Sequence, residues 1–259
     1  MRRPSPEEID SYCERYQVTA EVAWRDYLQL RLAEAVSRDN DLLELCIWKG
    51  AFVMRFVLQS ARASGDLDAT IGLNRDRVDE RRIRQRLIKA CEDLGLIIPK
   101  ATLDRGDDSL SFAPIEWTEP EVGTVRTSID LSLREDLALS PQKRRINAGL
   151  VPSFEVFHID LNEQTAEKMR CLVQRDKTGD GYDVSLLWAW RANLDETTIR
   201  RVVPSKLTSG KDHKATALAR VERRHQIWES QRGRELPRDA PTADEMRASC
   251  RAAIERWIP

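Results

Sequence analysis

The sequence predicts an α+β fold in which a mixed sheet with flanking helices is followed by a helical C-terminal part. Residues 64–71 and 125–133 alternate polar and apolar side chains with the period of two that half-buried strands show. Before Ser64 and after Asp160, apolar residues recur instead at the spacing of amphipathic helices. Because 259 residues suit one large domain or two small ones, we expect residues 1–160 to form one part and residues 161–259 the other.

Start signals predict two helices near the N-terminus. Ser5 and Glu8 form a capping box with Pro6 at the first helical position, and Thr19 can cap a second helix. The second helix would bury one apolar face, made of Trp24, Tyr27, Leu28, Leu32 and Ala35. After a break at residues 39–41, helical character resumes over 42–46, and a turn at residues 48–51 leads into a further apolar helix over 52–58.

The middle of the chain alternates strands with one basic helix. A strand is predicted to begin at Ser64. Asp66 and Asp68 would lie on one of its faces, and the apolar Leu67 and Ala69 on the other. A basic helix is predicted over Val78–Leu94. The remaining strands are predicted at Ile97–Ile98, Ser109–Trp117, Val125–Leu133 and Phe154–Ile159.

From Asp160 to the end, the pattern is helical. Asp160 can cap a helix that carries Lys168. Later helices are predicted over residues 182–190, 214–228 and 242–257, separated by segments that contain Pro204, Pro237 and Pro241.

Composition excludes several classes of protein. The chain is 41% hydrophobic and 33% charged, which supplies enough apolar surface for a core and argues against general disorder. The first ten residues lack the apolar run of a secretory signal, and the most apolar stretch, residues 42–58, contains three charges. We therefore expect a cytoplasmic protein with no membrane partner. The net charge is −1, but residues 200–234 carry ten Lys/Arg against three Asp/Glu.

Asp66 and Asp68 form the sharpest functional pattern. Carboxylates at i and i+2 of a strand project from one face, with Cα atoms ~6.6 Å apart. Their oxygens can converge on Mg²⁺, which prefers one or two carboxylates together with phosphate oxygens. Two other interpretations exist: solvated acids on an exposed strand, or the D-x-D sequence with which glycosyltransferases hold the metal of a nucleotide sugar.

The context of the D-x-D pair favours nucleotidyl transfer. The turn at Gly50-Ala51 opens a helix upstream of the strand, and helix N-termini bind phosphate. Asp130, on the polar face of a later strand, can add a third carboxylate, although an ordinary acid at the end of a strand would look the same. Three acids and a phosphate-binding turn suit a site where two metal ions stabilise the attacking and leaving oxygens.

Four segments occur in a recognisable order: Lys49-Gly50-Ala51, then Arg62-Ala63-Ser64-Gly65-Asp66-Leu67-Asp68, then Ala166-Glu167-Lys168, and finally Asp180-Gly181-Tyr182-Asp183. Together they resemble the motifs of the AbiEii/AbiGii nucleotidyltransferase toxins, which include the MenT proteins. Ala51 departs from the Ser or Thr usual in that family. Gly179 replaces the Arg of its R-D-x-Y-D-L segment, and Arg175, one helical turn earlier, could substitute for it.

The resemblance implies a polymerase-β-like nucleotidyltransferase core and a toxin of a toxin–antitoxin or phage-defence system, with a cognate antitoxin as partner. Several members of the family add nucleotides to the 3′ end of tRNA, which implies an RNA acceptor. Asp66 and Asp68 would then bind Mg²⁺, Lys168 would contact the triphosphate of an NTP, and Asp183 would complete the site. The nucleotide-binding positions carried over are Lys49, Gly50, Ala51, Ser64 and Arg175.

Simpler interpretations exist for several of these residues. Lys168 could be a solvated helix lysine, and Asp183 could be a helix N-cap. Arg220, Arg223 and Arg224 share one helix face that could neutralise RNA phosphates, bind the antitoxin, or simply be solvated. The segment from Asp176 mimics the start of a calcium loop, but Leu187 occupies the position where an EF-hand requires Glu, which excludes calcium.

The leading hypothesis is therefore a metal-dependent nucleotidyltransferase toxin that transfers NMP from an NTP to an RNA acceptor, the tRNA 3′ end. One alternative is transfer to a small molecule or to a protein hydroxyl. The other is a non-catalytic protein that binds nucleic acid or an antitoxin through a decayed transferase core, an alternative that Ala51 and Gly179 keep open.

Overall fold

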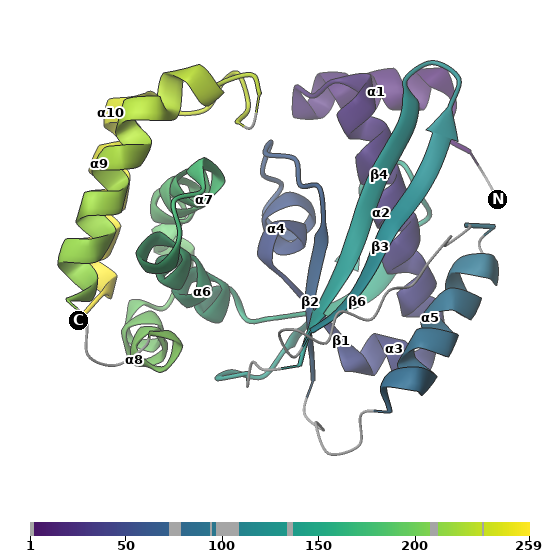
Figure 1. Cartoon of the computed structure of the whole chain (residues 1–259), viewed down its shortest axis with the longest axis horizontal. Helices are drawn as coiled ribbons and strands as arrows, with labels where there is room; N and C mark the ends of the chain where they lie inside the picture. Colours follow the sequence, from purple (N-terminus) through teal and green to yellow (C-terminus); the bar gives the residue numbers. More distant parts are fainter. Residues whose placement is uncertain are drawn as a thin grey trace. The chain divides into compact units, whose positions relative to one another are not determined.

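The computed structural model describes residues 3–72, 79–93, 95–96, 109–133, 137–207, 212–234 and 236–259. The chain divides into two compact units, Met1–Ile159 and Asp160–Pro259, which are described separately below (Figure 1). The strand predicted at Ile97–Ile98 lies outside the described residues.

A six-stranded mixed sheet forms the centre of the first unit, in the order β3-β4-β2-β1-β6-β5. β1 pairs antiparallel with β2 and parallel with β6, and β2 pairs parallel with β4. β3 pairs antiparallel with β4, and β5 pairs antiparallel with β6. The strands are β1 (Cys46–Lys49), β2 (Leu67–Ile71), β3 (Ser109–Glu119), β4 (Gly123–Ser132), β5 (Gln142–Ile146) and β6 (Phe154–His158). The mixed sheet predicted from the sequence is thus present.

Three details of the sheet differ from the expectation. β1 was predicted as the end of a helix and a turn, but its four residues form a central strand, too short to show alternation. β5 was not predicted, because its sequence QKRRI is almost entirely exposed on an edge strand. β2 begins at Leu67 rather than Ser64, so Asp66 precedes the strand.

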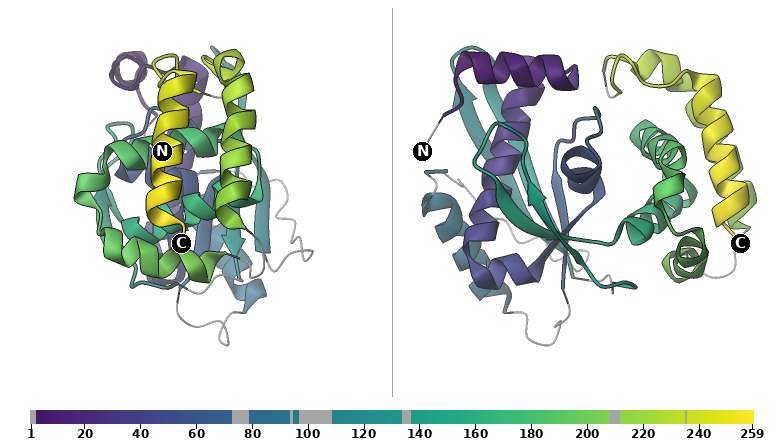
Figure 2. Two further views of the ribbon diagram at one scale, coloured as in Figure 1. Left: turned by 90° about the vertical axis from the view of Figure 1, so that its left-hand side faces the viewer. Right: turned by 180° about the vertical axis from the view of Figure 1, so that it is seen from behind.

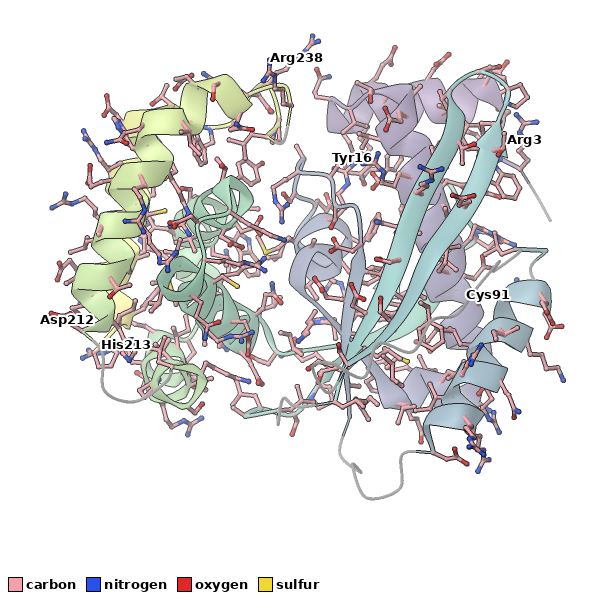
Figure 3. All side chains as sticks on the ribbon, viewed as in Figure 1. Arg3, Tyr16, Cys91, Asp212, His213 and Arg238 are labelled. Carbon is pink, nitrogen blue, oxygen red and sulfur yellow. The ribbon has the colours of Figure 1, made fainter. Side chains whose placement is uncertain are left out.

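Helices pack around this sheet (Figure 2). α2 (Ala20–Arg38) packs on β4 and β6 and is itself flanked by α1 (Pro6–Tyr16), α3 (Asn40–Leu45) and α5 (Glu80–Asp93). The predicted capping box at Ser5 and the cap at Thr19 are both present. α4 (Gly50–Phe52) continues as a π-helix over Val53–Val57, where an ordinary helix was expected. At the N-terminus, Arg3 forms an ion pair with Glu119 at the end of β3 (Figure 3).

Helix α2 is buried around most of its circumference, rather than along the one apolar face expected. Its Asp26 accepts hydrogen bonds from Arg55 at 2.9 and 2.6 Å, and both side chains are buried. Burial raises the pKa of Asp26, and the Arg55 charge partly offsets that effect. Arg55 also donates to the carbonyl oxygen of Ser60 at 2.6 Å. This pair therefore anchors the segment that leads from the π-helix towards Asp66.

The second unit contains α6 (Leu161–Gln174), α7 (Thr178–Ala189), a short 3-10 helix (Arg191–Asn193), α8 (Glu196–Lys206), α9 (His213–Gln231) and α10 (Ala243–Trp257). Asp160 caps α6 as predicted. α7 begins four residues before the predicted start at Tyr182, and α8, which contains Pro204 in its last turn, was not predicted. α9 and α10 run side by side and bury Trp228 and Trp257 (Figure 1).

Within the described residues, no helix is both long and apolar enough to span a membrane.

Candidate active site

Three carboxylates lie close together at the N-terminal end of β2. Asp68 lies in β2 directly opposite Asp130 of the neighbouring β4, and Asp66 lies in the bend just before β2. One oxygen from each of the three acids lies within 4.8 Å of the others, and all three residues are partly exposed. Mg²⁺ binds oxygens at about 2.1 Å, so two of its ligands lie at most ~4.2 Å apart. Small side-chain adjustments would let these acids share one ion, and the donor set therefore fits Mg²⁺.

Local hydrogen bonds hold Asp66, which the strand ladder does not reach. The Ser64 hydroxyl lies 2.8 Å from Asp66 Oδ1, and the Asp66 amide donates back to that hydroxyl at 3.4 Å. Ser64 was carried over from the resemblance as a nucleotide contact. In this structure its hydroxyl faces Asp66, and its side chain is largely buried.

The turn at Gly50 lies against the carboxylate of Asp68. Lys49, the last residue of β1, is paired in register with Asp68, and the chain then turns through Gly50 with φ +60. A Cβ at Gly50 would lie 2.3 Å from Asp68 Oδ2, a distance that real Cβ atoms essentially never show. Glycine is required here both by the left-handed backbone and by the close approach of the acid. Ala51, which follows, is buried and is the second residue of the short α4.

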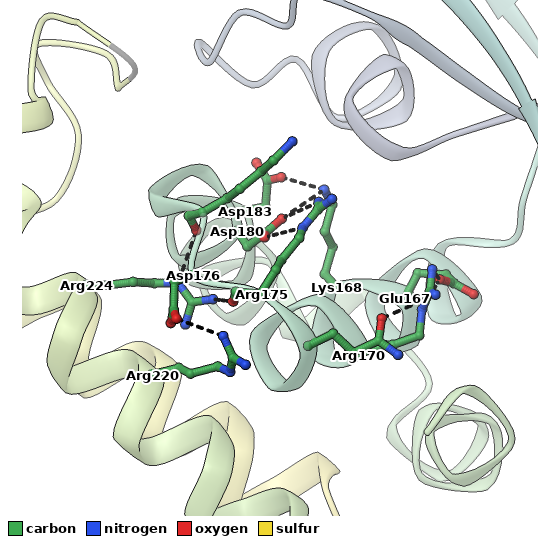
Figure 4. Close-up of polar contacts among 11 residues, drawn as sticks. Glu167, Lys168, Arg170, Arg175, Asp176, Asp180, Asp183, Arg220 and Arg224 are labelled. Atoms are coloured by element: carbon green, nitrogen blue, oxygen red, sulfur yellow. Dashed lines mark hydrogen bonds and ion pairs between the residues drawn. The ribbon is translucent and has the colours of Figure 1, made fainter. Parts of the chain in front are cut away.

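In the second unit, a buried ion cluster joins α6 to α7 (Figure 4). Lys168 Nζ lies 2.7 Å from Asp183 Oδ2 and 3.9 Å from Asp180 Oδ1. Arg175 donates to both oxygens of Asp180, at 2.8 and 2.9 Å. The side chains of Lys168, Asp180 and Asp183 are at most 5% exposed. Two cations and two acids balance in this cluster, as buried charges require.

This cluster corrects two simpler interpretations. Lys168 is buried and paired, so it is not a solvated lysine. Asp183 lies inside α7, whose N-cap position is Lys177, so it is not a helix N-cap. Sequence reasoning left Asp180 out of the candidate site, although the three-residue spacing to Asp183 places both acids on one helix face.

The basic face predicted on α9 is mostly engaged within the second unit (Figure 4). Arg220 and Arg223 bind the carboxylate of Asp176 at 2.8 and 3.2 Å. Arg224 is fully buried; it donates to the carbonyl oxygen of Lys177 at 3.0 Å and to that of Arg175. The structure therefore does not support Arg224 as an RNA contact, because loop carbonyls hold its side chain away from solvent. Arg220 and Arg223 remain partly exposed.

Comparison with known proteins gives the family. The sequence model of the family described as "Nucleotidyl transferase AbiEii toxin, Type IV TA system" matches residues 34–256, most of the chain. The chain belongs to this family. The resemblance inferred from the sequence motifs is thereby confirmed, and the family association implies an antitoxin partner.

Two solved structures share the fold of this AbiEii-family protein. MenT4, a nucleotidyltransferase toxin from Mycobacterium tuberculosis H37Rv, superimposes with a TM-score of 0.59 at 15% identity, covering 95% of this chain and 88% of its own. A protein from H. pylori described as a nucleotidyltransferase gives a TM-score of 0.60 at 12% identity, with coverage of 92% and 95%. These likenesses confirm the predicted fold class, a nucleotidyltransferase core followed by helices. No curated protein sequence matches the chain.

Proposed function

We propose that this AbiEii-family nucleotidyltransferase transfers NMP from an NTP to an RNA acceptor, the 3′ end of a tRNA, with Mg²⁺ bound by Asp66, Asp68 and Asp130. The observation that carries the proposal is the convergence of the three carboxylates within 4.8 Å, beside the glycine turn. Because tRNA and NTPs are cytoplasmic, we place the reaction in the cytoplasm.

The proposed reaction is an in-line displacement at phosphorus. The 3′-hydroxyl oxygen of the acceptor attacks the α-phosphorus of the NTP, the bond from that phosphorus to its bridging oxygen breaks, and pyrophosphate leaves as the hydroxyl loses its proton. Divalent ions at such sites stabilise the attacking and leaving oxygens. Holding the reactants in line supplies much of the remaining acceleration.

The residues of the chain have separate tasks in this proposal. Asp68 and Asp130 are held in register by the β2–β4 ladder, which fixes the spacing of two metal ligands. Lys49, Gly50 and Ala51 form the turn that lies against Asp68, and we assign them, with Ser64, to the nucleotide side of the site.

The Lys168 cluster is assigned to the phosphates of the NTP. The Lys168 ammonium is a compact charge, and it is held by ion pairs with Asp180 and Asp183 in a position that is almost completely buried. The side chain of Arg175 is 45% exposed while it pairs with Asp180, so it can also bind an anionic ligand. Charge stabilisation of the leaving pyrophosphate is the chemistry that these cations would supply.

RNA phosphates are assigned to Arg220 and Arg223, the two partly exposed members of the predicted basic face. Both already share the carboxylate of Asp176, so an RNA phosphate would compete with that acid. Contacts of this kind position RNA without reading its sequence. The antitoxin is proposed as a protein partner without a surface assigned to it.

A labelled-nucleotide assay tests the proposal. The purified protein is incubated with each labelled NTP, Mg²⁺ and total RNA, and the products are separated on a gel. Wild type should label RNA of tRNA size, whereas Asp66→Asn and Asp68→Asn should each lose activity by ~10³-fold, because removing a metal ligand costs several kcal/mol in the transition state. Asp10→Asn, an exposed acid on α1, is the matched control and should keep full activity.

Each other outcome has a definite meaning. Label on the protein or on a small molecule would replace the RNA acceptor with one of the alternatives. An absence of label with every NTP would support a non-catalytic binding protein. Near wild-type activity in a folded Asp66→Asn or Asp68→Asn variant would remove the metal assignment.

A further inference from the structure

Gln29 lies outside the sequence motifs but contacts two segments that carry metal-binding acids. It is on α2 and only 1% exposed. Its side-chain Nε2 donates to the carbonyl oxygen of Ser64 at 3.1 Å and to Thr127 Oγ1 at 3.2 Å. Ser64 lies two residues before Asp66, and Thr127 lies three residues before Asp130 on β4. One amide group therefore links the two segments.

The need for such a link follows from the register of the sheet. Asp68 and Asp130 face each other within the β2–β4 ladder, whose backbone hydrogen bonds fix their spacing. Asp66 precedes the first residue of β2, so the ladder does not hold it. Its carboxylate is held by the Ser64 hydroxyl, and the Ser64 backbone is held in turn by Gln29.

We propose that Gln29 is a positioning residue that sets the distance of Asp66 from the other two acids and thereby the divalent-metal affinity of the site. The inference deepens the proposed function and rests on it, because it assigns an outer residue to the same metal. Side chains that orient metal ligands typically change metal affinity or activity by 10–100-fold when they are replaced.

A second polar residue on the same face of α2 supports this interpretation. Asp26 lies three residues before Gln29 and binds Arg55, which donates to the carbonyl oxygen of Ser60. The segment that leads into Asp66 is therefore held at two points, Ser60 and Ser64, by buried side chains that depend on one helix. A buried amide that only filled space would not need both of its N–H groups directed at this segment and at β4.

The test measures binding of Mn²⁺ alone, by the loss of its free electron paramagnetic resonance signal, to the full chain without nucleotide. Gln29→Leu keeps similar volume but removes both donors, and Thr127→Val removes only the β4 end of the link. We expect Gln29→Leu to weaken Mn²⁺ binding by ~10–100-fold and Thr127→Val to have a smaller effect. In the transfer assay, raising Mg²⁺ should restore much of the activity of Gln29→Leu.

The matched control is Thr70→Val. Thr70 Oγ1 donates to the carbonyl oxygen of Ser132 at 3.3 Å, at the other end of the same strand pair. It should lose comparable stability in thermal unfolding and bind Mn²⁺ like wild type, which separates positioning from general destabilisation. If Gln29→Leu proves too unstable to measure, Thr127→Val and Gln29→Glu, which retains the shape but not the donors, provide the same comparison.

The results distinguish the two levels of the proposal. Wild-type Mn²⁺ affinity in Gln29→Leu, with binding still abolished in Asp66→Asn, would overturn the role of Gln29 and leave the metal site intact. If wild type and Asp66→Asn bound Mn²⁺ equally poorly, the proposed metal site would be refuted, and the proposed role of Gln29 would be refuted as well. A loss in Thr70→Val equal to that in Gln29→Leu would reduce Gln29 to a structural residue.

Discussion

Replacing Gly50 with alanine should separate backbone strain from damage to the site. Gly50 has φ +60, a conformation that costs an L-residue ~1–2 kcal/mol. For a unit of this size, a loss of 1 kcal/mol lowers Tm by about 2–4 °C, so the strain alone should lower Tm by about 2–8 °C. The protein should therefore still fold.

The added methyl group has a second consequence at Asp68. It would lie 2.3 Å from Asp68 Oδ2, whereas ordinary van der Waals contact begins at 3.4 Å. The carboxylate must therefore move by about 1 Å, and a misplacement of ~1 Å can cost ~10²-fold in rate. We expect Gly50→Ala to lose about two orders of magnitude of nucleotidyl transfer, far more than its loss of stability would explain.

Gly123→Ala provides the matched control. Gly123, at the start of β4, has φ +80, and a Cβ there would meet nothing within 4 Å. It carries the same type of strain without a neighbouring carboxylate. Transfer assays and thermal unfolding of both variants should show similar losses of Tm and a loss of activity in Gly50→Ala alone. Equal activities in the two variants would show that the position of Asp68 does not matter for the reaction.

Three further predictions concern the second unit. Lys168→Ala removes the cation that pairs with the buried Asp183 carboxylate and should destabilise the unit by ~3–5 kcal/mol. In the double variant with Asp183→Asn, thermal unfolding should show recovered stability, but titrations should show that NTP binding is still lost. Recovery of NTP binding would exclude Lys168 as a phosphate ligand. Replacing Arg220 and Arg223 with Gln should reduce the log–log salt slope of RNA binding by ~0.7 per lost contact, and an unchanged slope would place RNA elsewhere. Burial acts to raise the pKa of Asp176, but the hydrogen bond from Arg223 and the charge of Arg220 lower this pKa overall. The ionised Asp176 carboxylate therefore stabilises the fold above the usual carboxyl pKa, and this stabilisation is lost as the pH falls through the lower pKa of the folded state. The Tm difference between wild type and Asp176→Asn should shrink at acidic pH and stay constant near neutrality.

The features that the sequence predicted well are those governed by local chemistry. The caps at Ser5, Thr19 and Asp160 depend only on a side chain and the amides two or three residues later, and all three are present. β4 was predicted because one of its faces is buried and the other is not, which makes its alternation visible. The pairing of Asp68 with Asp130 could not be predicted, because register depends on neighbouring strands rather than on the segment itself.

The failures have a common physical cause, which is that burial is decided by tertiary contacts. The spacing of Arg220, Arg223 and Arg224 places them on one side of α9, yet only Arg224 is enclosed, because it reaches the carbonyls of the segment before α7. Three of the four residues of β1 are buried in the middle of the sheet, and so short an apolar segment does not distinguish strand from helix.

Three buried polar side chains of this protein share a structural role that helical periodicity does not predict. Arg55, Gln29 and Arg224 are each almost completely buried, and each donates to a backbone carbonyl, at Ser60, Ser64 and Lys177 respectively. The Ser60 and Ser64 carbonyls lie in the segment before β2, and the Lys177 carbonyl, which also accepts from the Asp180 amide at 3.2 Å, lies directly before α7. A buried carbonyl without a donor is costly, so a long polar side chain from a neighbouring helix stabilises the segment by supplying one. The two segments stabilised in this way lead directly into Asp66 and into the helix that carries Asp180 and Asp183. The helices α2 and α9, which contribute none of the acids of the candidate site, therefore hold the segments on which the positions of those acids depend.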